Sequence, residues 1–131
     1  MTPEKMAELT ALNREINAIP YTDLQGANEP ADLWIDTPIP GEMWVCRDFV
    51  LAKAQRLREN GWRPSALQVV LCFTEPPDSG YHAVLSVTVD GEKWILDSRS
   101  DDPYLMQIPS PNLYTWERIQ VAGTDQFEPV A

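Results

Sequence analysis

Two cysteines and one histidine are the side chains of this 131-residue protein best suited to nucleophilic or metal chemistry. Cys46 lies near the start of WVCRDFVLAKAQRLRENG, residues 44–61, which has the spacing of an amphipathic helix. A cysteine there is a candidate nucleophile, because the helix dipole and the unpaired first amides favour the thiolate. A small apolar plug, half of a disulfide and a metal ligand are the other interpretations of Cys46.

The disulfide and metal interpretations of Cys46 are weakened by the residue counts. A structural zinc site takes four Cys or His ligands, whereas this chain has two Cys and one His. Two cysteines do not make a disulfide scaffold, and in a reducing compartment they stay as thiols. Cys72 lies within the apolar run LQVVLCF, residues 67–73, and is expected to be a buried core residue.

Composition and charge limit the class of protein. With 44% hydrophobic and 23% charged residues, residues 1–131 are expected to form one domain whose core needs no disulfide. The formal net charge of −10 argues against binding to nucleic acid, which requires clustered Lys and Arg. The sequence shows no apolar run near the ~20 residues of a membrane span and no basic leader before an apolar block. We therefore expect a cytoplasmic protein that binds neither nucleic acid nor membrane.

Two helices are predicted before the first strand. Residues 3–19 have apolar side chains near helical spacing, with Thr2 as N-cap and a proline in the first turn. Residues 20–41 are rich in Pro, Gly, Asn and Asp and are predicted to form a long loop. The second helix is predicted over residues 42–60, and Gly61 is its expected C′ residue.

Cys46 is predicted to lie on the core-facing stripe of the second helix. Val50, Ala54 and Leu57 follow one another at helical spacing, and Cys46 comes one turn before Val50 on the same stripe. No Ser, Thr, Asp or Asn immediately precedes this helix as a cap. Its first amides could therefore meet a ligand or a negative charge.

Residues 67–121 are predicted to form a sheet. The strand candidates are residues 67–73, 81–89, 92–98 and 113–121. Asp90-Gly91 is the strongest hairpin signal in the chain, and its register places the apolar residues of both strands on one face. These residues are Ala83, Leu85, Val87, Trp94 and Leu96. Residues 123–131 are predicted to be a frayed tail.

The same hairpin register places the only histidine beside a carboxylate. A two-residue turn at residues 90–91 puts His82 opposite Arg99, with Asp97 as its diagonal neighbour at ~7–8 Å between Cα atoms. A carboxylate beside a histidine fixes the ring tautomer and stabilises the imidazolium. Cys46, His82 and Asp97 could then act as nucleophile, base and orienting acid. The alternative is core packing for Cys46 and a surface pair for the other two.

These residues and their order resemble the bacterial transglutaminase-like cysteine proteases. That family shows an Asn-containing helix, a Trp-x-Thr-Pro loop, a Cys-Glu-Asp-aromatic helix start, a His-(hydrophobic)-Val-Leu strand and a Leu-Asp strand. The corresponding segments here are LNREINAIPY, DLWIDTP, CRDFVLAKAQRLRENG, YHAVLSV and WILDS. The resemblance implies an α+β fold, papain-like or transglutaminase-like, with the Cys46 helix packed on an antiparallel sheet. It also implies Cys46 as nucleophile, His82 as general base and acid, and Asp97 as orienting carboxylate.

The departures from the family pattern concern calcium. Family members usually have Gly-Asp before the cysteine and Glu after it, and some bind calcium through those acids. Here Val45 and Arg47 flank Cys46, and only Asp48 keeps its acid. We therefore expect no cofactor and no retained calcium site.

Hydrolysis of an amide bond in a protein or peptide substrate is the function we favour. Backbone amides at the start of the Cys46 helix would stabilise the oxyanion. Trp34 and Gln25 are candidate further donors, although packing or an ordinary loop surface explains either residue. The same triad supports acyl transfer to an amine or deamidation of glutamine. A catalytically silent binding or assembly module that keeps the fold is the alternative from another class.

Overall fold

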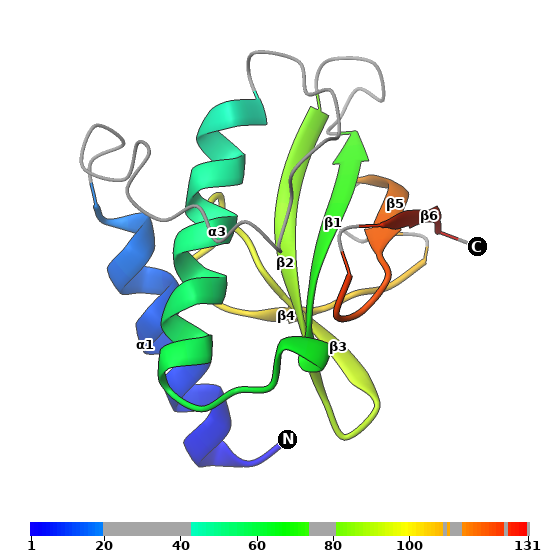
Figure 1. Ribbon diagram of the computed structural model, residues 1–131. Helices are drawn as coiled ribbons and strands as arrows, with labels where there is room; N and C mark the ends of the chain where they lie inside the picture. Colours follow the sequence, from blue (N-terminus) through cyan, green and yellow to red (C-terminus); the bar gives the residue numbers. More distant parts are fainter. Residues whose placement is uncertain (20–42, 74–80, 109, 111–113, 125, 131) are drawn as a thin grey trace.

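The computed structural model describes residues 1–19, 43–73, 81–108, 110, 114–124 and 126–130, with side chains in the second and third ranges described from Phe49 and His82 onward. In these residues, two helices lie on one face of a six-stranded antiparallel sheet (Figure 1). The predicted α+β class is confirmed. The sheet order is β4-β3-β2-β1-β5-β6. The elements are α1 (Pro3–Asn17), α3 (Met43–Glu59), the 3-10 turn η1 (Pro64–Ala66), β1 (Leu67–Phe73), β2 (Tyr81–Val89), β3 (Glu92–Leu96), β4 (Tyr104–Leu105), β5 (Thr115–Gln120) and β6 (Phe127–Pro129).

Helix α1 begins as its sequence predicts. The Thr2 hydroxyl accepts a hydrogen bond from the Lys5 amide at 3.2 Å, so the predicted N-cap is confirmed. The helix ends two residues earlier than predicted, and the Ile19 amide donates back to the carbonyl of Ile16. Its buried residues are Leu9, Leu12, Asn13 and Ile16.

Helix α3 matches the predicted bounds to within one residue at each end. Gly61 has a φ of 95°, its amide donates to Arg58 O, and the Trp62 amide donates to Leu57 O. This pair of bonds is a Schellman motif, so the predicted role of Gly61 as the C′ residue is confirmed. Val50, Ala54 and Leu57 are all buried, as their spacing predicts.

The hairpin of β2 and β3 has the predicted register. Asp90 and Gly91 both have positive φ angles, 52° and 82°, which a type I′ turn requires. Val89 pairs with Glu92, and Leu85 pairs with Leu96. The apolar faces of this hairpin therefore coincide, and they meet the helices.

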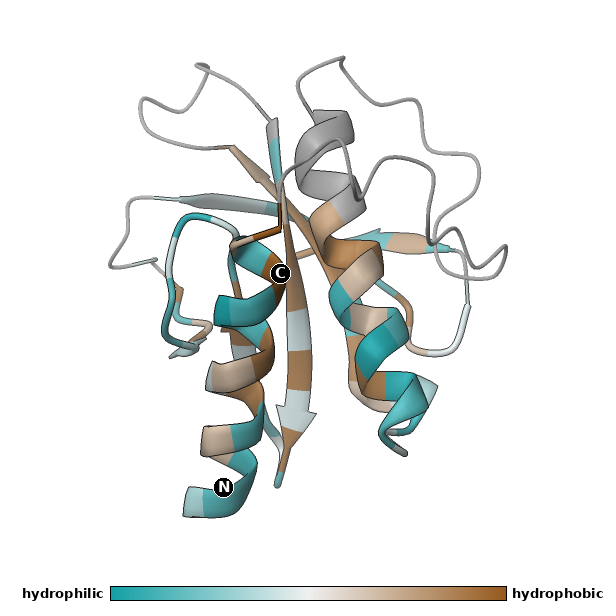
Figure 2. Ribbon diagram, turned by 90° about the vertical axis from the view of Figure 1, so that its left-hand side faces the viewer, coloured by the Kyte–Doolittle hydropathy of each residue, from teal (hydrophilic) through white to brown (hydrophobic). Residues whose placement is uncertain are grey.

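Apolar side chains cover both faces of the sheet. On the helix face, β1, β2 and β3 pack against α1 and α3 in one core cluster, and hydrophobic bands recur along both helices and the strands behind them (Figure 2). A smaller cluster on the opposite face contains Val70, Cys72, Val84, Ile95, Trp116 and Ile119. Cys72 is 0% exposed, so its predicted place in the core is confirmed.

The sheet differs from the prediction in two places. The prediction of a frayed tail is wrong for residues 127–129, which form β6 and pair with β5. Phe127 packs against the main core and Val130 against the smaller cluster, so burial on both faces offsets the entropy of ordering this end. The two-residue strand β4 was not predicted, and β3 ends at Leu96 rather than at residue 98.

The predicted loop of residues 20–41 lies outside the described residues. Within the described part of the chain, neither helix has the length and apolar character needed to cross a membrane.

Replacing Gly61 by Ala should lower the free energy of unfolding by about 1 kcal/mol, because an L side chain at this positive φ is strained although the space beside it is open. Urea unfolding monitored by tryptophan fluorescence measures the change. Asn60→Ala, one residue earlier and without a positive φ, is the matched control. Equal stability of Gly61→Ala and the wild type would contradict the expected strain.

Candidate active site

The candidate site lies at one end of the sheet. His82 is the second residue of β2, and Asp97 directly follows β3. The first turn of α3 lies at the same end of the molecule as the beginning of β2 (Figure 1). Since β2 and β3 are joined by a tight turn at the other end, the hairpin brings His82 and Asp97 together.

His82 and Asp97 form a buried pair. His82 Nε2 lies 2.7 Å from Asp97 Oδ1, and the two side chains are 0% and 1% exposed. The predicted proximity is confirmed, and the alternative of a surface pair is wrong. A buried carboxylate and imidazole at this distance share a charge-assisted hydrogen bond when the ring or the carboxylate is ionised.

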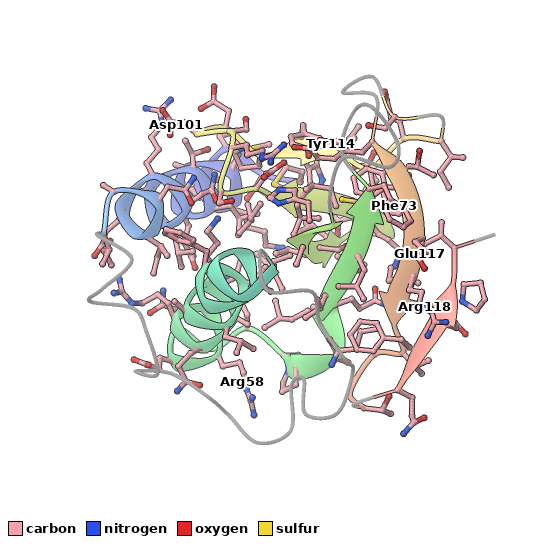
Figure 3. All side chains as sticks on the ribbon, turned by 90° about the horizontal axis from the view of Figure 1, so that it is seen from above. Arg58, Phe73, Asp101, Tyr114, Glu117 and Arg118 are labelled. Carbon is pink, nitrogen blue, oxygen red and sulfur yellow. The ribbon has the colours of Figure 1, made fainter. Side chains whose placement is uncertain are left out.

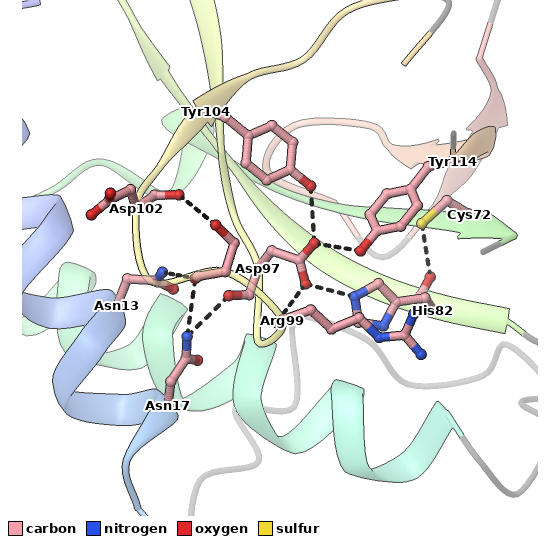
Figure 4. Close-up of polar contacts among 10 residues, drawn as sticks. Asn13, Asn17, Cys72, His82, Asp97, Arg99, Asp102, Tyr104 and Tyr114 are labelled. Carbon is pink, nitrogen blue, oxygen red and sulfur yellow. Dashed lines mark hydrogen bonds and ion pairs between the residues drawn. The ribbon is translucent and has the colours of Figure 1, made fainter. Parts of the chain in front are cut away.

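The Asp97 carboxylate accepts three further hydrogen bonds (Figure 4). Oδ1 also accepts from the Arg99 amide at 2.9 Å. Oδ2 accepts from the hydroxyls of Tyr104 at 2.9 Å and Tyr114 at 2.8 Å. An ionised carboxylate has about four acceptor positions, and all of them are used here.

These contacts determine the protonation of Asp97. Burial raises the pKa of this carboxyl, but the His82 hydrogen bond and charge, the Arg99 amide and the Tyr114 hydroxyl outweigh it and lower the pKa from 3.8 to about 2. Burial and the negative charge of Asp97 raise the pKa of Tyr114 well above its usual range. Asp97 is therefore an anion at neutral pH, and Tyr114 stays a hydrogen-bond donor.

Helix α1 anchors the segment that follows Asp97. Asn13 Nδ2 donates to the carbonyls of Ser100 at 2.7 Å and Asp101 at 2.9 Å. Asn17 Nδ2, one helical turn later, donates to the Asp97 carbonyl at 3.0 Å (Figure 4). Two asparagines on one face of α1 thus fix the backbone that carries the carboxylate.

Neighbouring strands surround His82. Tyr114 packs edge-on against the imidazole with ring centroids 5.6 Å apart. On β1, Cys72 is the strand partner of His82, and its thiol donates to the His82 carbonyl at 3.5 Å. Tyr114 lies at the upper edge of the molecule as Figure 3 shows it, near the end of β1 marked by Phe73.

Two of the three predicted site residues, His82 and Asp97, are in contact. The third, Cys46, is the fourth residue of α3. The Cys46 side chain lies outside the described residues, as do Trp34 and Gln25. The role of Cys46 therefore stays a prediction.

Four residues of the site were not predicted as such: Asn13, Asn17, Tyr104 and Tyr114. The asparagines are spaced i, i+4 on a predicted helix, a pattern that signals one polar face. Tyr104 follows Asp97 by 7 residues in a segment for which no element was predicted. Tyr114 follows it by 17 residues, inside the strand predicted over residues 113–121, but the neighbours of that strand in the sheet were not predicted, so the sequence held no signal for either contact.

The sequence of the chain matches a known family along nearly its whole length. The description of that family is bacterial transglutaminase-like cysteine proteinase, BTLCP, and the match covers residues 1–126. The chain belongs to this family. Family membership places the chain among cysteine peptidases, whose substrates are proteins. No curated protein matches the chain.

Solved structures of one bacterial protein are similar to this chain. Legionella pneumophila LapG is 23% identical with a TM-score of 0.59, over 91% of this chain and 70% of LapG. Its calcium-bound form is 21% identical with a TM-score of 0.58, over 94% and 71% of the two chains. Its EGTA-treated form is 24% identical with a TM-score of 0.57, over 94% and 70%. These similarities establish the transglutaminase-like fold.

The expectation of no cofactor is contradicted by these neighbours, because one of them is a calcium-bound protein. The expectation rested on the loss of two acids beside Cys46, at Val45 and Arg47. Loss of these two acids does not exclude calcium, since calcium takes about six to eight oxygen ligands and accepts backbone and amide carbonyls as well as carboxylates. Among the described side chains, no group of three or more His, Cys, Asp and Glu could hold a metal ion.

Replacing Asp97 by Asn should remove the part of the pH dependence of folding stability that comes from this carboxyl. The folded pKa is lowered from 3.8 to about 2, so the contribution is fully present above pH 3.8 and is lost as pH falls through 2. The wild type should lose about 2 kcal/mol relative to the variant between pH 4 and pH 2, measured by urea unfolding. Asp101→Asn, at an exposed position in the same segment, is the control. Parallel stability curves for the wild type and Asp97→Asn would contradict the assignment.

Replacing Asn13 by Ala should cost about 2 kcal/mol, because two carbonyls in a partly buried segment lose their donor. Arg14→Ala removes an exposed ion pair to Asp102 from the same helix and should cost under ~1 kcal/mol. Thermal unfolding of both variants gives the comparison. A loss for Arg14→Ala equal to that for Asn13→Ala would refute the anchoring role.

Proposed function

We propose that this chain hydrolyses an amide bond of a protein or peptide through a thioester on Cys46, with His82 as base and acid and Asp97 as the orienting carboxylate. The observation that carries the proposal is the buried His82–Asp97 contact of 2.7 Å. Asp97, held as an anion, stabilises the imidazolium that forms when His82 takes a proton. The family of cysteine proteinases supplies the reaction class.

The Asp97 contact supports different tasks for the two ring nitrogens. Asp97 engages Nε2, so Nδ1 is the nitrogen that would exchange a proton with the Cys46 thiol. The first residues of α3 carry Cys46, and a helix N-terminus favours a thiolate. Backbone amides of that same turn are the candidate donors to the oxyanion.

The proposed reaction has two halves. His82 takes the thiol proton of Cys46, and the thiolate sulfur then attacks the carbonyl carbon. The C–N bond breaks as His82 returns that proton to the leaving amine. A water molecule attacks the thioester and gives a proton to His82, after which the carbon–sulfur bond breaks and His82 returns that proton to the sulfur. The products are a carboxylic acid and an amine, and the Cys46 thiol is restored.

Iodoacetamide labelling of Cys46, followed by mass spectrometry over a range of pH, tests the proposal. In a Cys72→Ala background, labelling should stay rapid well below the ordinary thiol pKa of ~8.5. His82→Ala should slow labelling at pH 6 by at least about tenfold, because the imidazolium that stabilises the thiolate is lost. Labelling that follows an ordinary thiol and ignores His82→Ala would sink the proposal and favour a silent binding module.

Calcium is a candidate ligand of this chain because calcium-bound LapG is a structural neighbour. Calcium added to EGTA-treated protein should raise the melting temperature in a concentration-dependent way, since a ligand that binds only the folded state stabilises it. Magnesium is the control cation. Identical melting curves in calcium, magnesium and EGTA would exclude a calcium site that stabilises the fold.

A further inference from the structure

The two oxygens of the Asp97 carboxylate have different partners. Oδ1 faces His82 Nε2 and the Arg99 amide, at 2.7 and 2.9 Å. Oδ2 faces two phenol groups, those of Tyr104 at 2.9 Å and Tyr114 at 2.8 Å. Rotation of the carboxylate about its Cβ–Cγ bond would break both phenol contacts together with the His82 contact.

The two tyrosines approach Asp97 from elements on opposite sides of the β2–β3 hairpin in the sheet. Tyr104 lies on β4, where it pairs with Ile95 of β3. Tyr114 immediately precedes β5, the neighbour of β1. Figure 4 shows both hydroxyls pointing toward the same carboxylate oxygen. One donor on β4 and one next to β5 constrain the carboxylate more than two donors on one flexible loop would.

We propose that Tyr104 and Tyr114 are positioning residues that hold the Asp97 carboxylate so that His82 keeps its ring proton on Nε2. The inference deepens the proposed function and rests on it for its catalytic meaning. A neutral imidazole carries its proton on either nitrogen, and the partner of one nitrogen selects the tautomer. Only the form with the proton on Nε2 leaves Nδ1 able to accept the thiol proton of Cys46.

The surroundings of the carboxylate agree with this role. Among the described residues, the titratable side chains bonded to the carboxylate are His82 of β2 and the two phenols, and Arg99 contacts it through its backbone amide. The side chains of Arg99 and of Cys72 on β1 act electrostatically on Tyr114. Burial and the charge of Asp97 keep the Tyr114 phenol protonated, so its hydroxyl remains a donor. Donation to the anion also opposes the cost of burying it.

The tautomer of His82 can be measured directly by NMR, because the chain has one histidine and its imidazole gives one set of ring signals. The variants are Tyr104→Phe, Tyr114→Phe and the double variant, which remove only the hydroxyls and retain both rings. Imidazole ¹⁵N shifts give the tautomer, and exchange with water gives the protection of the ring N–H. At a pH high enough for the ring to be neutral, the wild type should show the proton on Nε2. The double variant should show both tautomers and exchange at least about tenfold faster, the factor expected for loss of charge-assisted hydrogen bonds.

Trp116→Phe is the matched control. Trp116 packs edge-on against Tyr114, and its indole donates to Gln107 O at 2.8 Å rather than to Asp97. This variant should lower the melting temperature and leave the tautomer and the exchange rate at their wild-type values. A double tyrosine variant that melts lower but keeps the wild-type tautomer and exchange would overturn the proposal.

The single variants keep the test decisive where the double variant fails to fold. Tyr104→Phe retains the Tyr114 ring against His82 and should give an intermediate exchange rate, whereas a wild-type rate in both single variants would refute the positioning role. The readout is separate from the proposed chemistry. A tautomer that depends on the tyrosines, together with Cys46 labelling that ignores His82→Ala, would support positioning and reject the proposed function.

Discussion

The burial of an anion is the constraint on which the rest of this structure depends. Asp97 is 1% exposed, and an ionised carboxylate removed from water costs several kcal/mol unless donors replace the solvent. The protein supplies those donors from four places: the imidazole of His82, the Arg99 amide and the hydroxyls of Tyr104 and Tyr114. Strands β2, β3 and β4, and the residue before β5, must all be in register for this set to exist.

Elements farther from Asp97 position the groups that surround it. The tight turn between β2 and β3 sets which residue of one strand lies beside which of the other, and so sets the partner of His82. The asparagines of α1 hold the backbone after β3, where the ladder with β2 has ended. The main core packs α3 on β2, so the helix that carries Cys46 is attached to the strand that carries His82.

Local signals in the sequence were enough for much of this arrangement. The helix bounds follow from a cap, a C′ glycine and apolar spacing, and the hairpin register follows from Asp90-Gly91 and strand alternation. That register placed His82 beside Asp97 without any motif. The phenol contacts could not be predicted in this way, since they join residues of β4 and of the segment before β5 to Asp97 through tertiary packing. The end strand β6 was missed for a related reason, because its stability comes from pairing with β5 rather than from its own short sequence. Calcium was wrongly excluded because flanking acids are only part of what a calcium ion can bind.

Coupling between Cys46 and His82 is the central claim, and the titration of the single imidazole by NMR in the wild type and in Cys46→Ala tests it most directly. A thiolate beside the ring stabilises the imidazolium, so removal of the thiol should lower the pH at which His82 loses its proton by at least about one unit. Superimposable titration curves for the two proteins would mean that the thiol and the imidazole do not interact, and would contradict the account.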